Sequence, residues 1–329
     1  MADNKPMDLS KNPEPAPLEA ILEQLRASDV PISVRSKAAS QLAECMDKPS
    51  SMAIAAHTFM DCLKTETDPQ LLGHIISIMG KKKLYSVVDC LIGILVCSGE
   101  TAVEKHYGRD FKTCDKGLRL RITAAQALGR MEDQRAVLPL IAMLNEPGEN
   151  YRLRLAIAES LGRLGDQQAL SPLVDIVNNE DENSQYLKES AVKALGMLGD
   201  IRALEPLLDM FESKKGWLNK FTFVKEQLIE AIGKIGGPSD NRTQAALFQA
   251  LEDRGQYIRL AAVESLAEVG DEQAVPHLLK RLFDKSDDVA MAAVNTLFHI
   301  GGEALIRDIL ASNDNLPQII RDELESYVP

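Results

Sequence analysis

Apolar residues recur along this chain at spacings of three and four, a pattern that predicts many short amphipathic helices. Between Arg121 and Leu144 one apolar run is followed by a polar break, and a second run opens near Pro139. Each predicted helix has about ten residues, a length at which an isolated helix is marginally stable in water. These helices must therefore be stabilised by packing against one another.

The same pattern repeats along the chain, once per helix pair. The residues at the break after the first helix of each unit align as Gly129, Gly162, Gly196, Gly233, Ala267 and Phe298. These positions are separated by 33, 34, 37, 34 and 31 residues. Two weaker units end near Ala43 and Met79, which gives about eight helix pairs. Such a period is typical of solenoids, in which each unit packs mainly on its neighbours.

Turn and cap residues also recur at fixed places in each unit. A glycine directly after leucine, as at Gly162, is expected to end the first helix in the left-handed conformation. Four residues after the break, an aspartate is expected to accept hydrogen bonds from the free amides that open the next helix. These aspartates are Asp133, Asp166, Asp200 and Asp271. Prolines near the front of the second helix fit there because a missing amide matters little.

The recurring elements are a basic residue, paired alanines, Leu-Gly-x-Leu-Gly-Asp and Pro-Leu. Together they resemble HEAT repeats, in particular the short bacterial repeats also called phycobilisome-lyase HEAT-like repeats. The resemblance covers roughly residues 18–311 and is most specific over 118–283. It implies an all-α fold, an α–α superhelix (a HEAT or armadillo-type solenoid), with the Ala-rich helices on the concave side.

The same pattern predicts how the chain is divided into segments. Residues 1–17 hold four prolines among polar residues, a composition typical of a disordered leader. Residues 18–329 are predicted to form a single solenoid. Its parts are divergent N-terminal repeats at 18–97, an inserted loop at 98–118, regular repeats at 119–311 and a C-terminal cap at 312–329.

Composition and charge narrow the function classes. A net charge of −12 disfavours a nucleic-acid surface, because phosphate binding needs a basic face, and favours a basic partner. No stretch approaches 18 uncharged apolar residues, so membrane insertion is not expected. The amino terminus lacks a signal-peptide pattern, and five cysteines, an odd number, indicate reduced thiols. We therefore expect a cytoplasmic protein.

A basic residue stands eight positions before six of these breaks. This column is Arg35, Arg121, Arg154, Lys188, Lys225 and Arg259. Asp29, Asp115 and Asp253 each lie six residues before the arginine of their own unit, as Glu182 does before its lysine. HEAT repeats commonly join neighbouring units through such pairs, so the resemblance implies a structural ladder. The alternative, a track for a polyanion, is weakened because pairing would neutralise the column.

Motifs for catalysis or metal binding are weak. No histidine is followed by glutamate, the pair through which a related HEAT-repeat family, the di-iron deoxyhypusine hydroxylases, binds metal. Cys97, His106, Asp110 and Cys114 share one loop, but their spacing matches no metal motif. Phosphate-loop and serine-nucleophile motifs are missing from the sequence. We expect no catalytic residues, no cofactor and no metal.

Aromatic residues and carboxylates supply the candidate partner-binding surface. The aromatic residues, from two insertions and from positions before the Ala-rich helices, are Tyr107, Phe111, Tyr151, Tyr186, Trp217, Phe221, Phe223 and Tyr257. Tyrosine and tryptophan dominate binding hot spots, although each ring could instead pack on its own loop. Glu159, Glu230 and Glu264 are among the carboxylates expected on the concave side, either as solubilising charges or as an acidic groove for a basic partner.

Two functions fit these features. The first is a non-catalytic scaffold or adaptor that binds another protein through its concave helices and an aromatic loop edge. The alternative comes from the resemblance alone: a subunit of an E/F-type phycobilin lyase, or a related chaperone that handles a bilin chromophore.

A spectroscopic test separates these two functions. If the chain handles a bilin, incubation with one should give a coloured complex whose absorption is shifted from that of free bilin. An unshifted spectrum would remove the lyase alternative and leave the scaffold.

Overall fold

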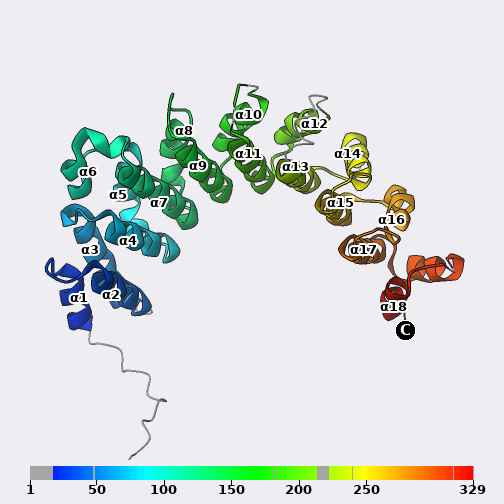
Figure 1. The fold of residues 1–329 in the computed structure, drawn as a ribbon, viewed down its shortest axis with the longest axis horizontal. Helices are drawn as coiled ribbons and strands as arrows, with labels where there is room; N and C mark the ends of the chain where they lie inside the picture. The colour runs from blue at the N-terminus through cyan, green and yellow to red at the C-terminus, as the bar shows by residue number, and fades with distance from the viewer. Residues whose placement is uncertain are drawn as a thin grey trace, which may run out of the picture. The chain divides into compact units, whose positions relative to one another are not determined.

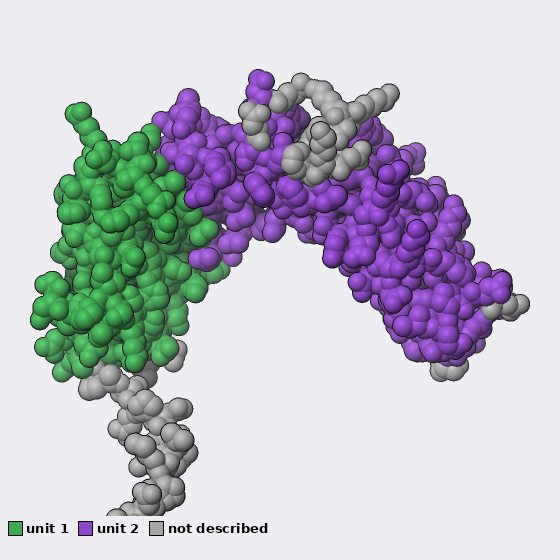
Figure 2. Space-filling view, viewed as in Figure 1, with its two compact units in different colours: residues 1–127 green, residues 128–329 purple. Residues whose placement is uncertain are grey.

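The structure is a computed structural model that describes residues 18–46, 49–179, 181–182, 184–212, 222–238, 240–313 and 315–328. Within these ranges every regular element is a helix (Figure 1). Residue contacts divide the chain into two compact units, unit 1 (residues 1–127) and unit 2 (residues 128–329), which Figure 2 shows in separate colours.

Unit 1 holds the helices of the divergent repeats. They are α1 (Leu18–Arg26), α2 (Ile32–Glu44), α3 (Pro49–Thr65), α4 (Pro69–Lys81), η1 (Tyr85–Val87), α5 (Val88–Val96), α6 (Ala102–Tyr107) and η2 (Gly108–Lys112). Helix α7 (Asp115–Met131) begins in unit 1 and ends in unit 2.

Unit 2 holds the regular repeats. Its helices are η3 (Gln134–Ala136), α8 (Val137–Leu144), α9 (Tyr151–Leu164), η4 (Gln167–Ala169), α10 (Leu170–Asn178), α11 (Gln185–Leu198), η5 (Ile201–Ala203), α12 (Leu204–Glu212), α13 (Thr222–Ile235), α14 (Asn241–Leu251), α15 (Gln256–Val269), η7 (Glu272–Ala274), α16 (Val275–Arg281), α17 (Asp287–Ser312) and α18 (Gln318–Ser326).

The helices of unit 2 form two rows. The inner row, α9, α11, α13, α15 and α17, lies on the concave side of the unit, and the outer row, α8, α10, α12, α14 and α16, lies behind it (Figure 1). Each inner helix packs on the next, and each outer helix packs on the inner helix that follows it. Such outer–inner pairs run from α1 with α2 to α16 with α17. This confirms the predicted all-α solenoid of about eight helix pairs.

Close contact between successive inner helices depends on glycine. A Cβ atom placed on Gly162 would lie 2.8 Å from Cα of Ala194, and one on Gly196 would lie 3.0 Å from Cβ of Ala231. The equivalent Gly129 and Gly233 face Ser160 and Ser265 at similarly close range. In unit 1, Gly80 meets Ala127 in the same way. A side chain at any of these positions would push two helices apart, because packed cores have no room for an extra methyl group.

These glycines therefore have a different role from the one predicted. Gly162 and Gly196 lie inside α9 and α11, which run on to Leu164 and Leu198. The left-handed helix ends are at Gly165 and Gly199, with φ of 68° and 64°. The prediction was wrong because the repeat contains two glycines, and helix-to-helix packing determines the first of them.

The aspartate caps are confirmed by the structure. The carboxylates of Asp133, Asp166, Asp200 and Asp271 each accept a hydrogen bond from the amide two residues later. Each cap opens a short 3₁₀ turn that leads directly into an outer helix. One capping interaction is typically worth about 1 kcal/mol, and it recurs here in four units.

The segment 98–118, predicted as an inserted loop, contains helix. Thr101 and Glu104 form a reciprocal capping box that begins α6, and η2 follows directly. Buried Val103 and Phe111 anchor this segment in unit 1. The expectation of a loop is wrong over 102–112, because a capped hydrophobic turn can form a helix as short as α6 when its apolar side is buried.

Helix α17 is long and apolar enough to pass a test for membrane spans by length and composition. However, Gly302 interrupts it with φ of 61° and ψ of −160°, so two helices meet at a sharp turn. The first part packs on α15 and α16, and α18 packs on α17 as well. These features are typical of a core helix in a helical array. A cytoplasmic location stays a prediction.

Substitution of Gly162 by alanine tests the inner-row contact. The added methyl group would overlap Ala194 of the next helix, so we expect a loss of about 2 kcal/mol in the free energy of unfolding, measured with urea. The matched control is Gly237→Ala, where an added Cβ meets no atom within 4 Å. Equal losses at the two positions would show that the close approach does not limit stability.

Candidate functional site

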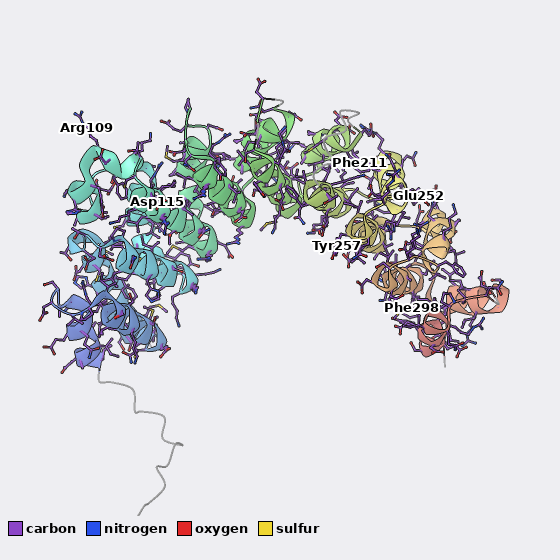
Figure 3. All side chains as sticks on the ribbon, viewed as in Figure 1. Arg109, Asp115, Phe211, Glu252, Tyr257 and Phe298 are labelled. Carbon is purple, nitrogen blue, oxygen red and sulfur yellow. The ribbon has the colours of Figure 1, made fainter. Side chains whose placement is uncertain are left out.

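The exposed face of the inner row in unit 2 carries the candidate site. Side chains three and four residues apart lie on the same face of one helix. Equivalent positions on successive inner helices therefore form rows that run across this face. The first turns of α11, α13 and α15 present Tyr186, Phe223 and Tyr257. Tyr257 projects from α15 on the concave side of unit 2 (Figure 3). We call this set the aromatic row.

Two members of the aromatic row touch each other. The rings of Tyr186 and Phe223 stack with their centroids 5.6 Å apart and their planes 18° from parallel. Tyr186 is nevertheless 60% exposed, and Tyr257 is 61% exposed. Phe223 is half-buried. A stacked pair whose outer faces meet solvent is a preformed apolar surface, which a partner can cover with little loss of side-chain freedom.

Carboxylates form a second row, one to two turns further along the same helices. The acidic row consists of Glu159, Glu189, Glu226, Glu230 and Glu264. Burial raises the pKa of Glu189, Lys193 opposes the shift, and repulsion from Glu159 and Glu226 adds to it. Burial also raises the pKa of Glu226, with further repulsion from Glu230 and Glu264. Neighbouring helices thus hold like charges close together, at a cost in stability at neutral pH.

The two rows meet on α11 and α13. Glu189 lies three residues after Tyr186, and Glu226 three residues after Phe223, so each carboxylate is one turn from an aromatic ring. An aromatic face and a carboxylate side by side are both attractive to a cation: the ring through its quadrupole and the carboxylate through its charge. The sequence indicated the two rings as candidate contacts, and it placed these two glutamates among the carboxylates expected on the concave side.

The basic column links neighbouring units of unit 2. Arg154 donates from Nε to the carbonyl of Leu144 at the end of α8 and from Nη1 to Glu182 at 2.8 Å. Lys225 pairs with Asp253 of the next unit. Arg259 binds Asp284 in the loop before α17, with Nε–Oδ2 at 2.8 Å and Nη2–Oδ1 at 2.5 Å. Lys188, which is 7% exposed, occupies the same column.

Unit 1 contains the same arrangement. Arg35 donates from Nε to the carbonyl of Leu25 at 3.0 Å and pairs with Glu66 at 2.6 Å. Arg121, fully buried, donates from Nε to the carbonyl of Leu95 at 2.9 Å. Each guanidinium thus satisfies a free carbonyl at the C-terminus of an outer helix, where the helix dipole also favours a positive charge.

Two of the predicted ladder aspartates lie elsewhere. Asp115, at the first turn of α7 (Figure 3), pairs with Arg119 at 2.9 Å, and both side chains are mostly exposed. Asp29 is exposed in the turn between α1 and α2, while Arg35 pairs forward to Glu66. The resemblance implied that such pairs join neighbouring units. In the pairs made by Arg35, Arg154, Lys225 and Arg259, the acid comes from the loop before the next inner helix.

The remaining predicted contact residues are divided between exposed and buried positions. Tyr151 is 47% exposed at the start of α9, and Tyr107 of unit 1 is half-buried, with its ring 5.8 Å from Nζ of Lys116. Phe111 is a correction, since it is only 2% exposed and belongs to the core beneath η2. Trp217 and Phe221 lie outside the described residues.

Metal and thiol chemistry have little support in the described part of the chain. No group of three or more His, Cys, Asp or Glu side chains there could hold a metal ion. Cys97, His106, Asp110 and Cys114 are all described and do not form such a group. All five cysteines are free thiols, and burial raises the pKa of Cys62 to about 11, so that thiol stays protonated and unreactive at neutral pH.

The sequence family of the chain follows from its repeats. A family model described as HEAT repeats matches residues 115–185, 148–223, 219–298 and 244–325, more than half of the chain in all. The chain therefore belongs to the HEAT-repeat family. A search of curated protein sequences finds no match to it.

Solved structures share the fold. Yeast importin-beta (Kap95p) is 16% identical with a TM-score of 0.54, over 94% of this chain and 46% of the importin chain. The complex of CpcE and CpcF of phycocyanin lyase from Nostoc sp. PCC7120 is 18% identical with a TM-score of 0.41, over 99% and 100%. Human deoxyhypusine hydroxylase is 19% identical with a TM-score of 0.29, over 94% of each chain. At 16% identity and a TM-score above 0.5, the likeness to importin-beta concerns the fold alone.

The pair of Arg259 and Asp284 should make stability depend on pH. Burial alone would raise the pKa of Asp284, but hydrogen bonds from Arg259 and from the amide of Ser286 lower it below its ordinary value. A lowered pKa means that the carboxylate stabilises the fold above the pKa of the unfolded chain, about 4, and that this stability is lost as pH falls through the folded value.

We therefore expect Asp284→Asn to reduce the free energy of unfolding by about 3 kcal/mol at pH 7, since it leaves the Arg259 charge buried without a counterion. The difference from the unsubstituted protein should shrink below pH 4, as urea unfolding at a series of pH values would show. Glu303→Gln removes an exposed pair with Arg307 and should change stability by only a few tenths of a kcal/mol. A pH-independent difference at Asp284 would contradict the ionic interpretation.

Proposed function

We propose that this chain is a non-catalytic scaffold whose unit 2 binds a partner protein through lysine or arginine side chains. The observation that supports this most directly is the stacked pair Tyr186–Phe223 beside the coupled carboxylates Glu189 and Glu226. The two groups offer a cation both an aromatic face and a negative charge on adjacent helices. A partner with a row of basic residues could occupy several of these positions at once.

The energetics of the acidic row also support binding. Burial, with added repulsion from neighbouring carboxylates, raises the pKa of Glu189 and Glu226, and a bound cation would relieve that repulsion. Binding of a cation is thus favoured by the relief of this repulsion as well as by the new contact. Rigid inner helices hold the groups in place, so that little ordering is needed on binding.

A role as a bilin lyase subunit is the alternative to this proposal, and the sequence resemblance described above is its only support. The absorption test with bilin separates the two, because it does not depend on Glu189 or Glu226. A scaffold with a basic partner should leave bilin absorption unchanged.

Binding of a lysine-rich peptide tests the proposal. We expect the full chain to bind a synthetic lysine-rich peptide and to reject the same peptide with glutamate in place of lysine, as measured by fluorescence anisotropy. Glu189→Gln with Glu226→Gln should weaken binding about tenfold or more, because two charge-assisted contacts are lost. Tyr186→Ala should weaken it about threefold. The affinity should fall with added salt.

The controls address folding and nonspecific attraction. Glu272→Gln removes an exposed carboxylate away from the inner row, and Tyr85→Ala removes an exposed ring of unit 1. Both should bind the peptide as the unsubstituted chain does. Removal of Glu189 and Glu226 charges should leave thermal stability equal or higher, so weaker binding could not be attributed to misfolding. Equal binding of the two peptides would overturn the proposal.

A further inference from the structure

A second site lies at the edge of unit 2, away from the acidic and aromatic rows. The loop between α14 and α15 and the loop between α16 and α17 border an open cavity of about 600 Å³. This volume is within the range of small-molecule sites. Glu252, labelled in Figure 3, marks the first of these loops, and Phe283 lies in the second.

The cavity is basic, although the whole chain has a net charge of −12. Five cationic side chains line it, namely Arg254, Arg259, Lys280, Arg281 and Lys285, against three carboxylates. The corresponding loops before α9 and α11 carry acidic residues instead, including Glu146, Glu149 and Glu182.

The carboxylates of the cavity are already neutralised. Asp284 is 3% exposed and is held by Arg259, while Asp253 pairs with Lys225 from the preceding unit. Glu252 lies at the rim, 58% exposed and 3.4 Å from Arg281. Since two of the three acids are paired within the ladder, the free charge that a ligand would meet is positive.

Several donors remain for such a ligand. Arg254, Lys280 and Lys285 are exposed and make no ion pair with any residue in the described ranges. Arg281 donates from Nη1 to the carbonyl of Leu251 at 2.8 Å, but its Nε atom is buried and has no hydrogen-bond partner among the described residues. An unpaired buried N–H of a guanidinium is costly.

An aromatic ring stands at the same cavity. Phe283 is 51% exposed, which is unusual for a phenylalanine, and it lies two residues from both Arg281 and Lys285. A planar group placed on this ring would keep an attached anion within reach of the basic side chains. Stacking on an aromatic ring does not depend on the hydrogen-bonding pattern of the base, so any nucleobase can stack there.

We propose that this cavity binds a nucleoside diphosphate or a closely similar organic phosphate. The phosphates would be held by Arg281, Lys280 and Lys285, and the base would lie on Phe283. The proposal does not depend on the partner-binding function, because its residues share none with the acidic or aromatic rows.

Calorimetric titration of the full chain with ADP tests this proposal, with pyrophosphate and adenosine as separate arms. We expect ADP to bind more tightly than either, with an affinity that falls as salt is added. Lys280→Gln with Lys285→Gln should weaken ADP binding about tenfold or more. Phe283→Ala should weaken ADP binding about fivefold and leave pyrophosphate binding unchanged.

The matched control is Lys193→Gln with Lys234→Gln, which removes two exposed lysines from the inner row of the same unit. This variant should bind ADP as the unsubstituted chain does. No ADP binding at millimolar concentration, or equal loss in the two lysine variants, would overturn the site. Pyrophosphate bound as tightly as ADP, together with an unaffected Phe283→Ala, would overturn the role of the ring.

Discussion

The packing of each inner helix on the next depends on one constraint, the absence of a side chain at a single position per unit. Gly129, Gly162, Gly196 and Gly233 each allow the following helix to approach at the level of its backbone. The residue it meets is always small, Ser160, Ala194, Ala231 or Ser265. This contact sets the spacing of the inner row, and the spacing in turn determines which side chains on neighbouring helices can touch.

Both candidate sites follow from that spacing. The stack of Tyr186 on Phe223 and the coupling of Glu189 with Glu226 arise because α11 and α13 lie close together along their length. The buried ladder also takes up acids of these loops. Arg259 binds Asp284, and Lys285 beside it makes no ion pair with any described residue. Architecture and binding surface therefore share the same residues and the same loops.

The fold could be predicted from the sequence because the same residue pattern repeats in every unit. A pattern repeated at 31 to 37 residues reports the packing of every unit at once, whereas one copy would have been ambiguous. The role of Gly162 was mistaken, since a helix end and a close helix contact both favour glycine and only the neighbour, Ala194, distinguishes them. The prediction that Phe111 contacts a partner was wrong for a similar reason, because nothing in the local sequence shows whether a ring in an insertion faces the core.

The candidate sites were only partly visible in the sequence. Tyr186 and Phe223 were both named as candidate contact residues, one before a helix and the other in an insertion, but their stacking depends on the approach of two helices. The basic cavity was missed because its residues come from two loops about thirty residues apart, and neither loop is conspicuous alone.

The sharp turn at Gly302 has a consequence for how the array ends. An open solenoid exposes at its last helix the same apolar side that every earlier helix buries, and a second molecule could stack there and extend the array into a filament. After the turn, the chain folds back, and Tyr327 covers Phe298 with ring centroids 4.5 Å apart and bonds to Asn295. One residue with a positive φ thus lets the chain turn back and cover part of α17, where another molecule could otherwise stack.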